Sequence, residues 1–278
     1  MPTTAPWSPA EPDLPTVLSN YANPALALAN AEIPAIVLRN AYDPAACHGL
    51  VQRFIQWGLM RDPIDSNSAD KRTRIDIGTS LGNRGNDKDK FLSHAVGTHE
   101  LFPHLFSGFT DPVKTMYDAL AALSPGKEVK TAREPDGRLY GPAIFRIHYT
   151  THSYIPHIDS VRLREKRTNY AVYRFEHQFA GILCLQNALH GERSAQTIVH
   201  NCLWTEEIQP HIANGTYHEY ARENNLDHYR VDLAPGDLYF FNTRCIHEIP
   251  PLDGNNPRIV LAVFIGFSPD DPEVYVWA

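Results

Sequence analysis

Asp237-Leu-Tyr-Phe-Phe-Asn242 and Arg258-Ile-Val-Leu-Ala-Val-Phe-Ile-Gly-Phe267 are two apolar runs that indicate the class of fold. A Pro-Gly turn signal precedes the first run, and the second is rich in β-branched and aromatic residues, as buried strands are. We therefore expect a β-rich core over residues 143–267. Further strands of this core are predicted at 143–149, 153–159, 180–187, 196–203 and 229–233.

The chain before residue 143 has a different pattern. Asp43-Pro44 and Asp111-Pro112 each predict the start of a helix, because aspartate caps a helix and proline fits its first turn. Apolar residues follow both starts at three- and four-residue spacing. The remaining expectations are a short strand at 35–39, polar loops near the mouth of the core at 62–89 and an irregular arm at 1–20.

Helices first and antiparallel strands afterwards predict one domain over residues 1–278, mainly β with α. Its core is expected to be a double-stranded β-helix, the cupin-like jelly roll, braced by N-terminal helices and loops at 21–142. An insertion at 205–225 begins with a capping threonine and two glutamates, and it is predicted to be helical.

Composition excludes several classes of partner. The formal net charge of −7 over 278 residues argues against a nucleic-acid polymer or an anionic membrane as partner, since both need a basic face. The four cysteines have no metal-binding or redox spacing and are expected to be reduced, which is typical of a cytoplasmic protein. No secretory signal or apolar run of membrane length is apparent. We expect a cytoplasmic protein with a small-molecule partner. The sequence does not indicate the oligomeric state of the protein.

A candidate metal site is formed by His157, Asp159 and His247. Side chains two residues apart on a strand point to the same side, so His157 and Asp159 can bind one ion together. His247 follows a predicted strand and can supply a second imidazole. Because the chain has 14 histidines, the His-x-Asp pair alone is weak evidence. Two histidines and one carboxylate on one face are the ligand set of non-haem Fe(II) oxygenases.

Arg258 begins the longest apolar run, eleven residues after His247. A guanidinium is costly to bury without a carboxylate partner, and its planar fork suits a dicarboxylic acid. The alternative is a surface arginine at the end of a strand.

The ordered set His157, Asp159, His247 and Arg258 resembles the core of the oxygenases that depend on 2-oxoglutarate and Fe(II). Ala143-Ile-Phe-Arg146 and the ending through Tyr275-Val-Trp277 are similar to a branch that acts on free small molecules and contains aliphatic halogenases and hydroxylases. In those halogenases glycine or alanine replaces the triad carboxylate, and a halide ion fills the vacated position. The carboxylate of Asp159 therefore implies hydroxylation, with desaturation or another oxidative outcome as the alternative.

The resemblance implies Fe(II), 2-oxoglutarate and O₂ as cofactor and co-substrates, with succinate and CO₂ as co-products. His157, Asp159 and His247 would bind the metal, and Arg258 would bind the distal carboxylate of 2-oxoglutarate. Arg146 is a further candidate for the co-substrate or the substrate, although a salt bridge at a strand edge is an equal alternative. Tyr149 and Asn242 are weaker candidates for polar contacts to the co-substrate.

The segment 160–178 concentrates basic and aromatic residues beside the predicted metal site. We interpret it as a lid whose Arg162 and Arg164 bind an anionic group of the substrate. A solvated loop with paired surface charges is the alternative. An amino acid derivative, a nucleotide or a natural-product intermediate would each suit such a site.

Two other classes of protein fit parts of the pattern. A zinc hydrolase can also use two histidines and a carboxylate, but it leaves Arg258 on a buried strand without a role. A non-catalytic jelly-roll binding protein leaves His157, Asp159 and His247 without a role.

Overall fold

The computed structural model describes residues 7–65 and 69–278, and it contains two main β-sheets with most of the helices on one side. The parts of the predicted arm and polar stretch at 1–6 and 66–68 lie outside the described residues. The larger sheet has eight strands. These are β1 (Ile36–Leu38), β11 (Leu238–Asn242), β6 (His177–Gln186), β13 (Arg258–Phe267), β14 (Glu273–Trp277) and β3 (Glu128–Thr131) in order, with β4 (Ile144–His148) paired to β13 and β2 (Arg74–Ile77) paired to β4.

The smaller sheet carries the strands that face the large sheet across the core. Its order is β10 (His228–Arg230), β9 (Ile198–Leu203), β12 (Cys245–Ile249) and β5 (Tyr154–His157), and a short hairpin joins β7 (Leu189–His190) to β8 (Arg193–Ser194). Both sheets are antiparallel apart from the β14–β3 pair. This arrangement confirms the predicted fold, mainly β with α and a jelly-roll core.

Alternation along β13 explains why the large sheet is buried on both faces. Ile259 and Leu261 belong to a core shared with the helices, whereas Val260 and Ala262 belong to a core between the two sheets. Such two-sided burial requires a nearly continuous apolar strand, as the sequence has here.

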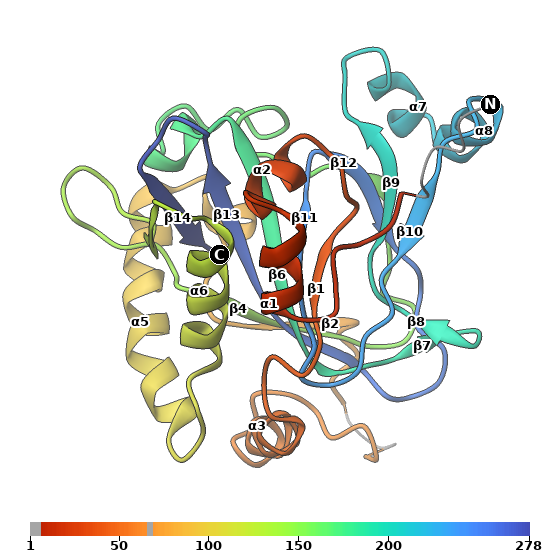
Figure 1. Cartoon of the computed structure of the whole chain (residues 1–278). Coiled ribbons are helices and arrows are strands. Elements are labelled where there is room, and N and C mark those ends of the chain that lie inside the picture. The colour runs from red at the N-terminus through yellow and green to blue at the C-terminus, as the bar shows by residue number, and fades with distance from the viewer. Residues whose placement is uncertain (1–6, 66–68) are drawn as a thin grey trace.

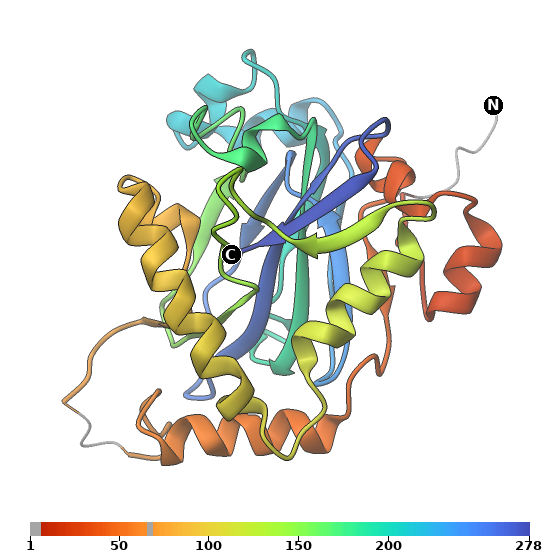
Figure 2. The ribbon, with the colours of Figure 1, turned by 90° about the vertical axis from the view of Figure 1, so that its left-hand side faces the viewer.

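Helices cover the outer face of the large sheet (Figures 1 and 2). Asp43 caps α3 by accepting a hydrogen bond from the backbone of Ala45, and Asp111 caps α6 in the same way through Val113. These two helices and the 205–225 insertion were predicted. The helices are α1 (Leu14–Asn20), α2 (Pro24–Ala29), α3 (Pro44–Gln56), α4 (Leu81–Arg84), α5 (Lys88–Phe106), α6 (Pro112–Leu123), the 3₁₀ helix η1 (Ala171–Arg174), α7 (Gln209–Ala213) and α8 (Tyr217–Glu223).

Two expectations about boundaries were wrong. The predicted arm contains the helix α1, which the side chain of Asp13 caps by accepting from the backbone of Thr16. The sheets also extend beyond residues 143–267, because β1, β2, β3 and β14 complete the large sheet. These strands are short or lie at sheet edges, where alternation gives little signal. Within the described part of the chain, no helix has the length and apolar character needed to cross a membrane.

Candidate metal and co-substrate site

A cavity of about 440 Å³ lies between the inner faces of the two sheets. Alternate residues of the large sheet form one wall, and residues of β5 and β12 form the other. Its lining includes many charged and metal-ligating side chains, among them Arg74, Arg146, His148, His157, Asp159, Arg164, Arg167, His247 and Arg258.

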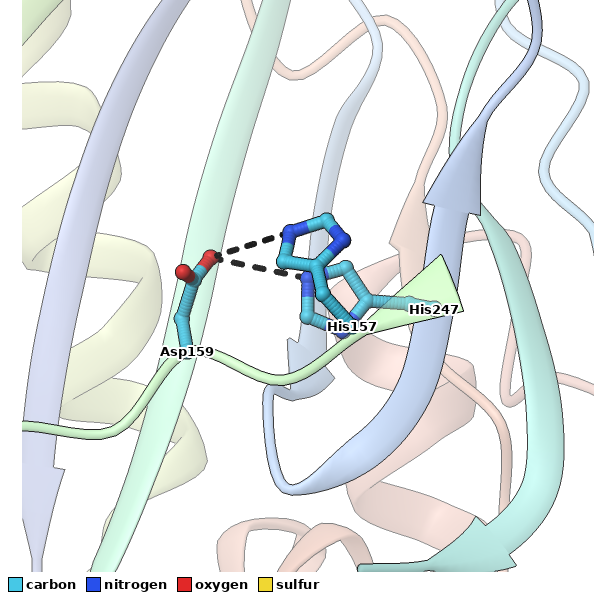
Figure 3. Close-up of side chains that lie close together, drawn as sticks. All are labelled: His157, Asp159 and His247. Atoms are coloured by element: carbon cyan, nitrogen blue, oxygen red, sulfur yellow. Dashed lines mark ion pairs between the residues drawn. The ribbon is translucent and has the colours of Figure 1, made fainter. Parts of the chain in front are cut away.

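The three predicted metal ligands converge in this cavity (Figure 3). His157 ends β5 and lies directly opposite His247 in the antiparallel pairing of β5 with β12. Asp159 follows two residues later, and its Oδ2 lies 3.8 Å from Nε2 of His157 and 3.5 Å from Nε2 of His247. His247 was expected just past the end of a strand, but it lies within β12, a separate strand that follows a turn at Thr243 and Arg244.

Backbone hydrogen bonds orient both imidazoles for metal binding. Nδ1 of His157 lies 2.7 Å from the carbonyl oxygen of Ile155, and Nδ1 of His247 lies 2.9 Å from that of Cys245. A carbonyl only accepts, so Nδ1 carries the proton and Nε2 keeps its lone pair. Both Nε2 atoms face the carboxylate of Asp159. This neutral, preoriented donor set fits a divalent metal such as Fe(II).

Ionisation in the cavity also favours metal binding. Burial lowers the pKa of His157 to about 4, so this imidazole is neutral at pH 7. Burial alone would raise the pKa of Asp159, but the contacts with the two imidazoles and the positive charge of Arg164 outweigh it and hold that pKa below its ordinary value. The carboxylate is therefore ionised and the ligand set carries one negative charge.

Arg258 lies at the inner end of the same cavity with its guanidinium buried. Nε donates to Oε1 of Gln196 at 2.8 Å, and Nη1 donates to Nδ1 of His148 at 3.2 Å. Burial lowers the pKa of His148 well below its ordinary value, and Arg258 adds to this effect, so this imidazole is a neutral acceptor. No carboxylate of the described residues forms an ion pair with Arg258. A buried guanidinium without a counter-ion fits the distal carboxylate of a dicarboxylic acid.

Arg146 lies on the same face of β4 as His148, two residues before it, and it lines the cavity. Its Nε is buried and has no hydrogen-bond partner. The other cavity arginines are paired, Arg74 with Asp76 at 2.6 Å, Arg164 with Asp159 at 3.2 Å and Arg167 with Glu165. Among the residues that the structure describes, Arg146 and Arg258 are thus the cavity arginines without a carboxylate partner.

Tyr149 and Asn242 do not line the cavity, contrary to expectation. Tyr149 follows His148 and points to the opposite side, where its ring packs under the guanidinium of Arg61 at 3.5 Å. The side-chain amide of Asn242 donates to the carbonyl oxygens of Leu28 and Ala29 at the end of α2. Alternation along each strand accounts for both placements, because the neighbours His148 and Phe241 are the residues that face the cavity.

The two arginines of the predicted lid have different positions. Nη1 of Arg164 donates to Oδ1 of Asp159 at 3.2 Å and to the carbonyl oxygen of Ile158 at 2.8 Å. Arg164 therefore holds the carboxylate oxygen that faces away from the imidazoles. Arg162 is exposed, does not line the cavity, and has its guanidinium 6.0 Å from the ring centre of Tyr173.

Sequence reasoning missed two neighbours of Arg258. His148 was not among the candidate site residues, although its two-residue spacing from Arg146 was a signal that both share a face. The contact of Gln196 with Arg258 could not be predicted, because this glutamine before β9 belongs to no recognisable sequence motif. The free, buried state of all four cysteines agrees with the expected reduced packing residues.

Comparisons with known proteins agree with this geometry. Residues 14–278 match the family model of the carrier-protein-independent halogenase WelO5. A crystal structure of an N-substituted L-amino acid dioxygenase from Burkholderia ambifaria AMMD is 18% identical, with 91% of this chain and 89% of that chain covered and a TM-score of 0.55. A structure of that type of enzyme from the same organism in complex with alpha-KG is 17% identical over the same shares, with a TM-score of 0.53. These likenesses show a common fold, and no curated protein matches the chain.

The family match covers nearly the whole chain, from α1 to the last residue. It removes the zinc hydrolase and the non-catalytic binding protein as alternatives. The cofactor and co-substrates of such enzymes are Fe(II), 2-oxoglutarate and O₂, as predicted. The chain belongs to the WelO5 family within the Fe(II)- and 2-oxoglutarate-dependent oxygenases.

Proposed function

We propose that this protein is a hydroxylase that oxidises an unactivated C–H bond of a small anionic molecule, with succinate and CO₂ as co-products. The observation that carries the proposal is the carboxylate of Asp159 beside the two imidazole nitrogens. Halogenases need this position vacant for a halide. Here a charged carboxylate fills it, and Arg164 holds that carboxylate in place through its other oxygen.

In this proposal different residues of the cavity bind the metal and the co-substrate. His157, Asp159 and His247 would hold Fe(II), which supplies the activation of O₂ that is coupled to decarboxylation of 2-oxoglutarate. Arg258 would bind the distal carboxylate of 2-oxoglutarate, with Gln196 and His148 fixing the guanidinium. The apolar residues of the large sheet exclude water from the space between these groups.

The balance of charge in the cavity supports an anionic substrate. Three of its five arginines have carboxylate partners, which leaves Arg146 and Arg258. The two carboxylates of 2-oxoglutarate would be used by Arg258 and by the metal. Arg146 then remains as a partly buried cation, and a negatively charged group of the substrate would neutralise its charge. A carboxylate or a phosphate meets this requirement.

Amino acid derivatives, nucleotides and natural-product intermediates with an acidic group are therefore the classes to test. N-substituted L-amino acids are a reasonable first set, since they combine one carboxylate with a hydrocarbon group and give their name to a structural neighbour. The cavity volume of about 440 Å³ is within the range of ordinary small-molecule sites.

The test has two stages. Fe(II) and 2-oxoglutarate added without O₂ should produce a visible charge-transfer band, and a screen of anionic metabolites with O₂ should then identify the substrate by succinate release. Mass spectrometry of the product, made in the presence of chloride, is expected to show one added oxygen atom and no chlorine. A chlorinated product would overturn hydroxylation, and absence of the band would overturn the assignment of the metal site.

The anionic substrate is tested separately with Arg146→Met. Once a substrate is found, this variant should raise its KM while the affinity for 2-oxoglutarate stays near that of the unaltered protein. Equal binding of the substrate by both proteins would contradict the role of Arg146.

A further inference from the structure

A second group of metal-ligating side chains lies outside the cavity. His200 from β9, His218 from α8 and Glu248 from β12 bring one ligand atom each to within 4.8 Å of one another. None of the three lines the cavity. We propose that these residues form a Zn²⁺ site that joins the 205–225 insertion to the small sheet.

The spacing of the ligand atoms fits a tetrahedral ion. Nε2 of His200 lies 3.1 Å from Oε1 of Glu248, and Nε2 of His218 lies 3.3 Å from Oε2 of the same carboxylate. Zinc binds such nitrogen and oxygen ligands at about 2.0–2.1 Å, which separates two ligands of a tetrahedron by about 3.3 Å. Because the two imidazoles face different oxygens of Glu248, the carboxylate would bind the ion through both oxygens, and the two imidazole nitrogens would complete the four ligand atoms.

Burial and charge also favour a cation at this place. The side chains of His200 and Glu248 are only 6% and 15% exposed, so the carboxylate is largely removed from water. His218 is 58% exposed, so an ion can reach the cluster from the solvent on this side. His228, which is opposite His200 in the β10–β9 pair, adds another imidazole with its ring centre 5.8 Å away.

The proposed ion would act on the strand that carries an iron ligand. His247 and Glu248 are consecutive on β12, and they face the cavity and the opposite side respectively. The insertion packs behind this strand, where Ile158 and Ile246 share a cluster with Tyr217 and Ala221 of α8. Figure 1 shows α7 and α8 beside β9 and β10, on the far side of the sheets from α5 and α6. The zinc would thus fix α8 against the strands that position the active-site ligands.

Metal stoichiometry tests the proposal without any measurement of catalysis. Zn²⁺ is titrated in competition with a chromophoric chelator into protein stripped of metal. The unaltered protein should bind two equivalents, one at each site. His157→Ala should bind one, and so should His218→Gln, whose side chain is exposed enough to be replaced without loss of the fold. His48→Gln, an exposed histidine on α3, is the matched control and should bind two.

Thermal denaturation gives the second measurement. Zn²⁺ should raise the melting temperature of His157→Ala but not that of the double variant His157→Ala/His218→Gln, because a ligand that binds only the folded state stabilises it. Two equivalents bound by His218→Gln, or none bound by His157→Ala, would show that the cluster is held by hydrogen bonds alone and would overturn the proposal. Because neither readout needs iron or 2-oxoglutarate, failure of the proposed hydroxylase activity would not affect this result.

Discussion

Arg258→Met should separate the binding of 2-oxoglutarate from the binding of iron. Arg258 is 2% exposed, and its guanidinium is fixed by Gln196 and His148 rather than by a carboxylate. Methionine fills much of the same volume without a charge. The substitution therefore removes the predicted anchor of the distal carboxylate and leaves His157, Asp159 and His247 unchanged.

The expected loss of affinity follows from the burial of the ion pair between Arg258 and the distal carboxylate of 2-oxoglutarate. Removing one partner of a buried, hydrogen-bonded charge pair costs about 2–5 kcal/mol of binding. Since every 1.4 kcal/mol is tenfold, the affinity for 2-oxoglutarate should fall roughly 30-fold to 4,000-fold. The stability of the ligand-free protein should not fall in parallel, because a buried charge without a counter-ion contributes little to folding.

The assay is a titration of the Fe(II) protein with 2-oxoglutarate without O₂, followed by the charge-transfer band. Iron binding is measured separately, and Arg146→Met is the matched control because it removes the other unpaired cavity arginine. We expect Arg258→Met to shift the titration midpoint far more than the control does. The reasoning is refuted if Arg258→Met weakens iron and 2-oxoglutarate binding equally, or if it leaves the midpoint unchanged.

Three further predictions concern the metal ligands and the lid. His247→Ala should lose Fe(II) binding and turnover of 2-oxoglutarate to succinate, and intact turnover would disprove its role as a ligand. Arg164→Gln should weaken Fe(II) binding in an equilibrium titration by about two- to fivefold, since an exposed ion pair contributes up to about 1 kcal/mol, whereas Arg162→Gln should not. Burial lowers the pKa of His157 from 6.5 to about 4 in the folded protein, so below pH 6.5 the unfolded chain takes up a proton that the folded chain resists. The free energy of unfolding of the metal-free protein should therefore fall by about 3 kcal/mol between about pH 6.5 and pH 4, and urea denaturation should show a flatter pH profile for His157→Gln.

The fold was predictable wherever a strand is long and buried on both faces. β11 and β13 have the predicted bounds 238–242 and 258–267, because their apolar runs are uninterrupted. Short strands such as β2 and β3 have partly exposed residues and no apolar run, so only their pairing in three dimensions defines them. The helix α1 was missed because its prolines suggested an irregular arm, although Asp13 and Pro15 form the same type of start as in α3.

The site was predictable to the extent that it depends on spacing along single strands. His157 and Asp159 are brought together by local geometry, whereas His247 and Arg258 depend on how the sheets pair. The placements of Tyr149 and Asn242 failed because alternation says which residues share a face but not which face is inside. The partners of Arg258 come from two other segments, and a single sequence contains no record of such contacts.

The carbonyl oxygens of Ile155 and Cys245 have a consequence for how the enzyme acquires its metal. They orient both imidazoles before any ion arrives, so every divalent ion of similar size meets the same prepared ligands. Such nitrogen and oxygen donors bind Fe²⁺ more weakly than Co²⁺, Ni²⁺, Cu²⁺ or Zn²⁺. Selection for iron must then come from the metal supply, and purification in air with trace zinc will yield inactive protein. Stripping with a chelator and anaerobic loading with Fe(II) should precede every measurement of turnover.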